Sequence, residues 1–240
     1  MLTQPLIEGI TLILASSVAT NRKGLALPME QLSENLLENT ATITAVAWDE
    51  RLAFWISQIG SPPLTTTACI ALGVLSLPAS RSTWYWMGIY LLLVVLMPLL
   101  YLVWLLKKGH ITDIHLKVRE QRTRPLLVTV AAAFLAWGIL HFGAAPRLLV
   151  ALAAAMCLQT VIFLAITLRW KISFHSASAA GMAVMAWLVV GSLSIGFALS
   201  VPIIAWARVR LQRHTAGQTF AGATLGGGIL LSVLYMYLLI

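Results

Sequence analysis

The sequence has few charged residues, and after Glu120 it has no carboxylate at all. Charged residues make up 10% of its 240 positions and hydrophobic residues 60%, whereas about a quarter of the residues in a soluble domain are charged. This composition excludes a soluble globular protein. It predicts an all-α fold, a polytopic bundle of helices that crosses a membrane.

The sequence is also poor in cysteine. Its two cysteines, Cys69 and Cys157, each lie inside an apolar run with no Cys or His at the spacing of metal ligands. We interpret both as small buried hydrophobic residues. The sequence therefore predicts no metal site and no cofactor.

Positive charge is concentrated in the second half of the chain. Twelve of the sixteen Lys and Arg residues lie from Lys107 onward, in short clusters at the ends of apolar runs. Such clusters differ from the continuous basic stripe of a nucleic-acid-binding protein, so no nucleic-acid partner is expected. A cluster of one sign at the edge of a bilayer favours an anionic partner, and we expect a phosphate group on a lipid.

The first 60 residues differ from the rest. Glu30, Glu34 and Glu38 recur every four residues with leucines between them, a pattern typical of an amphipathic helix at a membrane surface. A second such segment, residues 48–59, is followed by Gly60-Ser61-Pro62-Pro63, which ends a helix. We therefore expect an amphipathic, interfacial N-terminal segment over residues 1–60 and a transmembrane domain over residues 61–240.

Seven hydrophobic runs follow, and they predict about six to seven transmembrane helices. The stretch 176–206 is long for one helix and short for two, but the turn-forming residues at 191–196 favour a hairpin of two short helices. In the last run, Gly222 and Gly226 are spaced for close contact with another helix. The runs are Pro63 to Ala79, Thr83 to Leu106, Leu126 to Gly143, Arg147 to Leu168, Ser176 to Val190, Ile195 to Trp206, and Thr215 to Ile240.

Strict alternation of these helices, with the hairpin counted as two, brings three polar loops to one face of the membrane. They are residues 107–125, 169–175 and 207–214. The loops around residues 80–82, 143–147 and 191–196 then lie on the other face.

Each of the three polar loops carries residues suited to an anion. Lys117 and Arg124 are seven positions apart, which places them on one face if the segment is helical. Ser173 stands at the start of a helix, where free backbone N–H groups bind anions, and His175 lies beside it.

The third loop carries Arg208, a planar cation that suits phosphate oxygens, and His214 four residues before Gln218. At this spacing the amide oxygen of Gln218 can accept a proton from one imidazole nitrogen and leave the other free.

In this order the three loops resemble the signatures of the type 2 phosphatidic acid phosphatase superfamily of membrane lipid phosphatases. The first signature, Lys, six residues, Arg-Pro, matches Lys117 to Arg124-Pro125 completely. The second, Pro-Ser-Gly-His, keeps only Ser173 and His175. The third, Ser-Arg, five residues, His, three residues, Asp, keeps Arg208 and His214 but has Gln218 in place of Asp. The resemblance covers residues 60 to 240.

The resemblance implies a metal-independent phosphatase that acts on a lipid phosphate monoester or an isoprenoid (di)phosphate. It implies that His214 is the nucleophile that forms a phosphohistidine and that His175 protonates the leaving lipid oxygen. It also implies the hairpin at residues 176–206, because a single span would place the two histidines on opposite faces. The implied phosphate ligands are Lys117, Arg124, Arg208 and Ser173.

The departures from the family pattern leave alternatives open. Gln218 is similar to what polyisoprenyl diphosphate phosphatases have at this position, which favours an active enzyme with a changed substrate preference. Phe174 in place of Gly either crowds the phosphate or lines the lipid entrance. The alternative function is a non-catalytic membrane protein that binds lipid phosphates. We expect a location in the cell membrane, and the sequence leaves open the lipid, the side of the membrane that carries the site and the oligomeric state.

Overall fold

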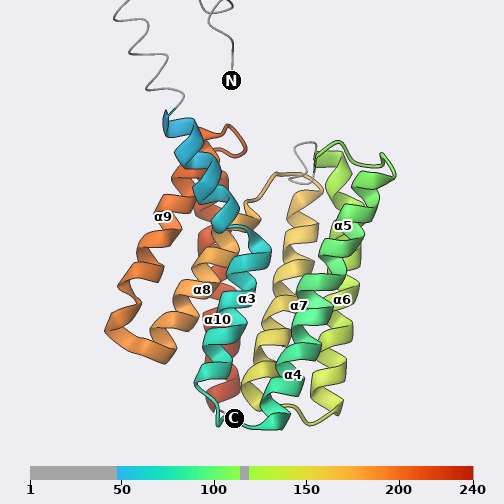
Figure 1. Ribbon diagram of the computed structural model, residues 1–240, viewed down its shortest axis with the longest axis vertical. Helices are drawn as coiled ribbons and strands as arrows, with labels where there is room; N and C mark the ends of the chain where they lie inside the picture. The colour runs from blue at the N-terminus through green and yellow to red at the C-terminus, as the bar shows by residue number, and fades with distance from the viewer. Residues whose placement is uncertain (1–47, 114–118, 240) are drawn as a thin grey trace, which may run out of the picture. The chain divides into compact units, whose positions relative to one another are not determined.

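The computed structural model describes residues 48–113 and 119–239 of the chain. Within these ranges every regular element is a helix (Figure 1). The chain divides into two units between Arg51 and Leu52, and residues 52–240 form a single compact unit. The predicted amphipathic helix around Glu30, Glu34 and Glu38 lies outside the described residues.

Residues 48–59 are helical and Gly60 forms a turn, so the predicted end of this helix is confirmed. A 3-10 turn over Arg119–Arg122 comes before α6. The remaining helices are α3 (Pro62–Leu75), α4 (Arg81–Leu91), a π-helical turn (Leu92–Leu96), α5 (Met97–Lys107), α6 (Thr123–Phe142), α7 (Arg147–Thr167), α8 (Phe174–Val190), α9 (Ile195–Arg210) and α10 (Ala216–Leu239).

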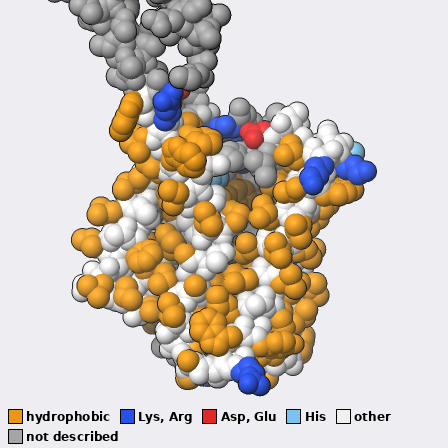
Figure 2. Space-filling view, viewed as in Figure 1, with side chains coloured by type: hydrophobic (Ala, Val, Ile, Leu, Met, Phe, Trp, Pro, Cys, Tyr) orange, Lys and Arg blue, Asp and Glu red, His pale blue; other side chains and the backbone are white. Residues whose placement is uncertain are grey.

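In the described part of the chain, five helical stretches are long and apolar enough to cross a membrane. They are Arg81–Lys107, Thr123–Phe142, Arg147–Thr167, Phe174–Arg210 and Ala216–Tyr237. Hydrophobic side chains cover most of the face shown in Figure 2, and Lys and Arg side chains lie toward its two ends. This distribution is the one a bilayer requires, because charged groups are costly in its hydrocarbon core.

The long stretch Phe174–Arg210 is not one straight helix. A 3-10 turn over Gly191–Ser194 reverses the chain, and Gly191 has a φ of 57°, which favours glycine. α8 and α9 consequently run side by side in opposite directions (Figure 1). The predicted hairpin is confirmed.

The hairpin brings the three polar loops to one end of the bundle, as the alternation of helices predicts. The connections α5–α6, α7–α8 and α9–α10 lie at this end, and the connections α3–α4, α6–α7 and α8–α9 lie at the other (Figure 1). We call the first end the loop end.

α10 packs closely on α8. A Cβ atom added to Gly222 would collide with the backbone of Ser173, and one added to Gly226 would collide with the backbone of Ala177. The predicted close contact at Gly222 and Gly226 is therefore confirmed, and it fixes the start of α8 against α10.

Candidate functional site

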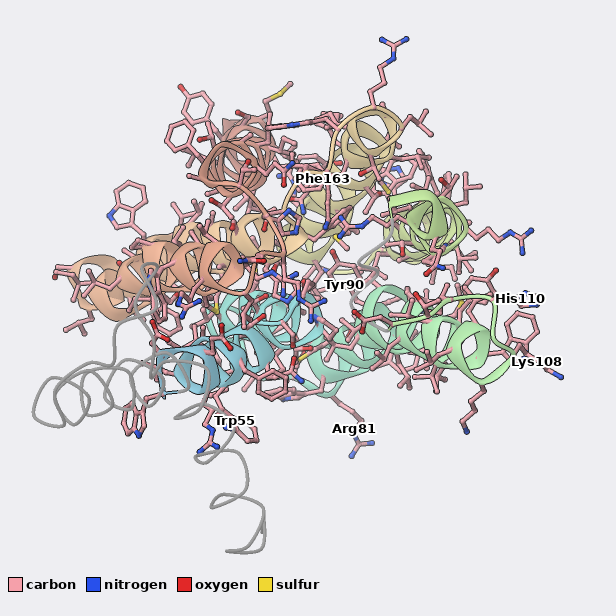
Figure 3. All side chains as sticks on the ribbon, turned by 90° about the horizontal axis from the view of Figure 1, so that it is seen from above. Trp55, Arg81, Tyr90, Lys108, His110 and Phe163 are labelled. Carbon is pink, nitrogen blue, oxygen red and sulfur yellow. The ribbon has the colours of Figure 1, made fainter. Side chains whose placement is uncertain are left out.

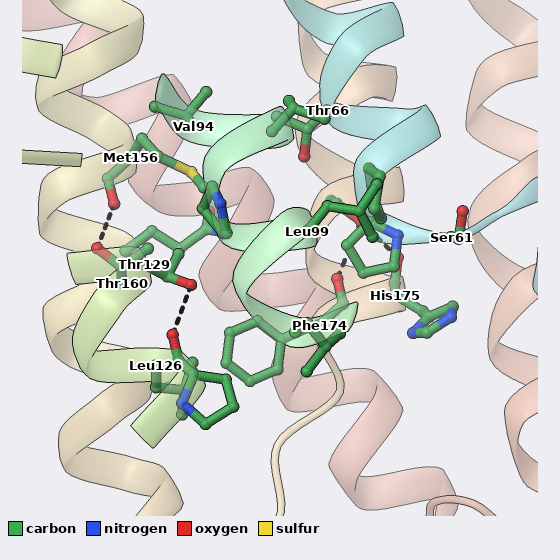
Figure 4. Close-up of a pocket in the computed structure, with 18 of the residues that line it drawn as sticks. Ser61, Thr66, Val94, Leu99, Leu126, Thr129, Met156, Thr160, Phe174 and His175 are labelled. Atoms are coloured by element: carbon green, nitrogen blue, oxygen red, sulfur yellow. Dashed lines mark hydrogen bonds between the residues drawn. The ribbon is translucent and has the colours of Figure 1, made fainter. Parts of the chain in front are cut away.

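A cavity of about 400 Å³ opens between the helices at the loop end. Its polar lining includes four groups that come from the three predicted loops: Arg122, His175, Arg208 and His214. Its apolar lining comes mainly from the π-helical turn, α5, α6, α7 and the start of α8, including Val94, Leu99, Leu126, Met156 and Phe174 (Figure 4). The site thus joins a cationic end to an apolar wall.

The turn after α9 places Arg208 and His214 next to each other. The carbonyl oxygen of Arg208 accepts from the backbone N–H groups of Arg213 (3.0 Å) and His214 (3.3 Å). Gln212 has a φ of 52°, and its N–H donates to Val209 O at 2.9 Å. These bonds form a Schellman motif, which ends a helix in a tight reversal.

The imidazole ring of His214 is held by two oxygen acceptors. Its Nδ1 lies 3.2 Å from Oε1 of Gln218 and 3.3 Å from the carbonyl oxygen of Lys171. Because a carbonyl oxygen only accepts, these partners assign the hydrogen to Nδ1 and leave a lone pair on Nε2. Nε2 makes no hydrogen bond within the described part of the chain. The structure thus has the bond expected from the four-residue spacing.

Gln218 also caps α10. Its side-chain Oε1 accepts from the backbone N–H of Thr215 at 3.2 Å, and the backbone N–H of Gln218 donates to Thr215 Oγ1 at 3.3 Å. This reciprocal pair is a capping box, in which a Thr and a Gln three residues later satisfy each other's backbone groups. The backbone bond also fixes which atom of the Gln218 amide faces His214.

The surroundings of His214 keep its ring neutral. The side chain is 7% exposed. Burial first, and then the positive charges of Arg208, Arg122 and Lys171, lower its pKa to about 3, although the bond from Gln218 raises it. At neutral pH the ring is therefore an uncharged imidazole with a free Nε2, which is the form that can act as a nucleophile.

Two arginines are buried at the cationic end. Arg208 is 2% exposed, its Nη1 donates to Ser57 Oγ at 2.7 Å, and its Nε has no partner among the described residues. Arg122 is 5% exposed, and burial lowers its pKa to about 10, so it stays charged at neutral pH. No Asp or Glu is among the described residues that line the cavity. Two buried guanidinium groups on a cavity with this lining favour an anionic ligand.

Arg124 does not share this cavity. Its side chain is exposed and lines a separate pocket with Leu105, His110 and Ile111. Seen from the loop end, His110 lies at the rim of the bundle, whereas Tyr90 and Phe163 lie inside it (Figure 3). Residues two apart on a helix point about 200° away from each other. Arg122 and Arg124 therefore cannot both face His214, and the fold turns Arg122 inward.

The family signature points to Arg124, and nothing in the sequence marks Arg122 as the arginine that faces the cavity. Arg119, Arg122 and Arg124 follow each other so closely that only the register of the helix start distinguishes them. Lys117, the partner expected for Arg124, lies outside the described residues.

Ser173 holds the start of α8 in place through both its side chain and its backbone. It is fully buried and caps α8, because its Oγ accepts from Ser176 N at 3.4 Å and contacts Ser176 Oγ at 3.1 Å. Its own N–H donates to Gln218 O at 3.3 Å, which ties the start of α8 to α10. Ser173 is not among the residues that line the cavity, whereas His175 is.

Phe174 lines the cavity and packs edge-on against Phe163, with the ring centroids 5.0 Å apart. It therefore belongs to the apolar lining.

Lys171 is a further cation near the site. The backbone carbonyl oxygen of Lys171 contacts Nδ1 of His214. The pKa of the Lys171 side chain is lowered first by burial and then by the charges of Arg122, Arg208 and Arg213. Arg213 pairs with Asp113 at 3.0 Å. No motif marks Lys171, and its carbonyl contact could not be read from residue types.

The described residues contain no group of three or more His, Cys, Asp or Glu side chains placed to hold a metal ion. Comparison with known proteins found no protein family, no curated protein and no solved structure that matches the chain.

Proposed function

We propose that the chain is an integral membrane phosphatase that removes a phosphate group from a membrane lipid, with His214 as the nucleophile. The observation that carries the proposal is the state of the His214 ring. It is neutral, its Nδ1–H faces two carbonyl oxygens, and its Nε2 is free in a cavity lined by buried Arg122 and Arg208. The likeness of the loops to the type 2 phosphatidic acid phosphatase signatures supports the same reaction.

In the proposed reaction, Nε2 of His214 attacks the phosphorus atom of a lipid phosphate. A P–N bond forms, the bond from phosphorus to the lipid oxygen breaks, and this oxygen takes a proton from protonated His175. Water then attacks the phosphohistidine, its proton passes to His175, and inorganic phosphate leaves. Splitting one displacement into two steps is the advantage of a covalent intermediate.

Arg122 and Arg208 are proposed to hold the equatorial oxygens of the phosphoryl group. Phosphoryl transfer depends mainly on positioning and on neutralising the charge of these oxygens, which fixed cations supply. The carbonyl oxygens of Gln218 and Lys171 stabilise the positive charge that the His214 ring gains when phosphorylated, because they already accept from Nδ1.

The apolar lining supports a lipid as the substrate. Val94, Leu99, Leu126 and Met156 line the same cavity as the cations. A lipid phosphate places its charge at the membrane surface and its chains in the hydrocarbon core, so it matches both parts of this cavity.

We propose six or seven membrane crossings. α8 has 17 residues and α9 has 16, which at 1.5 Å per residue gives about 25 Å each, close to the ~30 Å of a bilayer core. Counted separately, they raise the five apolar stretches to six, and α3 is the candidate for a seventh.

The side of the cell membrane that carries the site is measurable with Lys108→Cys, which places a thiol at an exposed position at the loop end. The native Cys69 and Cys157 are buried, so they contribute little background. Labelling of intact cells by a membrane-impermeant maleimide places the site outside, and labelling only after permeabilisation places it inside.

The function is tested by offering phosphatidic acid and an isoprenyl diphosphate to the detergent-purified protein with a chelator present. We expect phosphate release, a phosphorylated His214 in trapped samples, and loss of both in His214→Asn. The matched control is His141→Asn, because His141 lies in the last turn of α6 at the opposite end. Release that survives His214→Asn would contradict the mechanism.

A second candidate function is a protein that binds lipid phosphates without turnover, and the lack of a carboxylate beside His214 is the observation for it. The neutral amide of Gln218 stands where the family has an Asp, and it cannot balance the charge of a phosphohistidine as a carboxylate does. Binding of phosphatidic acid without release of phosphate from any lipid would support this candidate.

A further inference from the structure

Gln159 is a polar side chain within an apolar helix. It lies in α7, eight residues before the end at Thr167, which is about 12 Å along the helix. The side chain lines the cavity and makes no hydrogen bond within the described part of the chain. A free amide in a membrane-spanning helix is costly, so such groups commonly mark a binding site.

Thr160 and Thr129 also line the cavity, and each hydroxyl group donates a hydrogen bond to a backbone carbonyl. Thr160 Oγ1 donates to Met156 O at 2.8 Å, and Thr129 Oγ1 donates to Pro125 O at 2.9 Å (Figure 4). Both hydrogen bonds stay inside their own helices. Neither threonine oxygen accepts from Gln159 among the described residues, so the amide N–H of Gln159 is available to donate to a ligand on this wall.

This wall lies deeper in the membrane than the phosphate-binding cations. Thr129 and Thr160 are equally far along the chain from the α6–α7 connection, so they lie at the same level of this antiparallel pair. Thr129 follows Arg122 by seven residues, about two turns or ~10 Å along the helix. Arg122 and Gln159 both line the cavity, so a single lipid in it can contact both side chains.

We propose that the amide N–H of Gln159 donates a hydrogen bond to an acyl carbonyl oxygen of the lipid whose phosphate lies at Arg122 and Arg208. This rests on the proposed function and names its substrate class, a phosphate lipid with an ester or amide carbonyl just below the head group. Isoprenoid chains have no acceptor at this depth. An isoprenoid phosphate would therefore leave the Gln159 amide without a partner, and this lowers its affinity relative to a lipid that has the carbonyl.

The test compares two lipids that differ only in the carbonyl groups: diacyl phosphatidic acid and its dialkyl ether analogue with equal chains. Dissociation constants and phosphate release are measured for wild type, Gln159→Met and Leu158→Met. Leu158 is the matched control, because it neighbours Gln159 and is 46% exposed. Ceramide 1-phosphate, offered in parallel, distinguishes an amide carbonyl from an ester carbonyl.

We expect the wild type and Leu158→Met to prefer the diacyl lipid by about tenfold, the value of one hydrogen bond. Gln159→Met should reduce this ratio to about one. The ratio is measured within each variant, so a partly misfolded preparation does not change it.

A wild type that treats the two lipids alike, or a Gln159→Met variant that keeps the preference, overturns the assignment of Gln159. If no lipid releases phosphate, the proposed function fails. The ratio of dissociation constants still decides the role of Gln159 in that case, because it needs binding alone.

Discussion

The amide oxygen of Gln218 lies 3.2 Å from Nδ1 of His214 and at the same distance from the backbone nitrogen of Thr215. One neutral group therefore orients the histidine ring and caps the first turn of α10. A Glu at this position keeps the length and the acceptor oxygens but adds a charge, which makes Gln218→Glu a selective probe of the ring.

Gln218→Glu should raise the pKa of His214 above its value of about 3, because a carboxylate favours the charged ring. The acid limb of kcat/KM that belongs to His214 then moves to higher pH. The measurement is the pH profile of phosphate release, compared with wild type on one substrate so that the ionisation of the substrate cancels. An unchanged acid limb contradicts the assignment of His214 as the nucleophile.

The low pKa of His214 also predicts how stability changes with pH. In the unfolded chain the ring takes up a proton near its usual pKa of 6.5, whereas in the folded protein it does so near 3. The unfolded state binds more protons between these values, so His214 should reduce stability as pH falls from 6.5 towards 3. Thermal unfolding in detergent across this range should show a smaller loss in His214→Asn than in wild type.

Arg122 and Arg124 form a matched pair for mutation. Arg122→Gln should lower kcat/KM by about 10²-fold or more, the loss seen when one group that stabilises transition-state charge is removed. Arg124→Gln should stay within about threefold, because its side chain is exposed and lines another pocket. The reverse order of effects would show that phosphate binds elsewhere.

Gly222→Ala should separate α10 from the start of α8, because the new methyl group collides with the backbone of Ser173. Overpacking of this kind costs about 1–3 kcal/mol, and the unfolding midpoint should fall by about 2–4 °C for each kcal/mol. Activity should fall with it, since Ser173 N–H bonds to Gln218 O.

Gly228→Ala is the control for this change. A Cβ atom at Gly228 meets nothing within 4 Å, and Ala is the better helix former, so this variant should be neutral or more stable. Equal losses in both variants would show that contact at Gly222 is not the cause.

Gln212→Gly should stabilise the protein by about 1 kcal/mol. Gln212 has a φ of 52° at the position of a Schellman motif where glycine is preferred, because a side chain is strained there. Phosphate release should be retained, since Arg208 and His214 keep their backbone bonds. A lower melting temperature would indicate that the Gln212 side chain makes a stabilising contact of its own.

Local spacing made part of this structure predictable. The four-residue spacing of His214 and Gln218 sufficed for their hydrogen bond. The turn-forming residues at 191–196 indicated the hairpin, and the alternation of helices then gave the shared loop end. Both follow from the geometry of a helix, which depends on nearby residues alone.

The remaining features depend on contacts that residue types do not encode. The inward turn of Arg122 depends on where α6 begins, at Thr123, and helix boundaries are the least predictable part of a sequence. The contact from Lys171 to His214 uses a backbone carbonyl, which every residue has.

The hydrogen bond from Arg208 to Ser57 joins positions 151 residues apart. A ribosome adds about 5–20 residues per second, so the two halves of this contact leave it roughly 8–30 s apart. During that interval the chain gains the helices from α3 to α8 while it still lacks both Arg208 and His214. The proposed site therefore cannot be complete until α9 and the turn that carries His214 have been added.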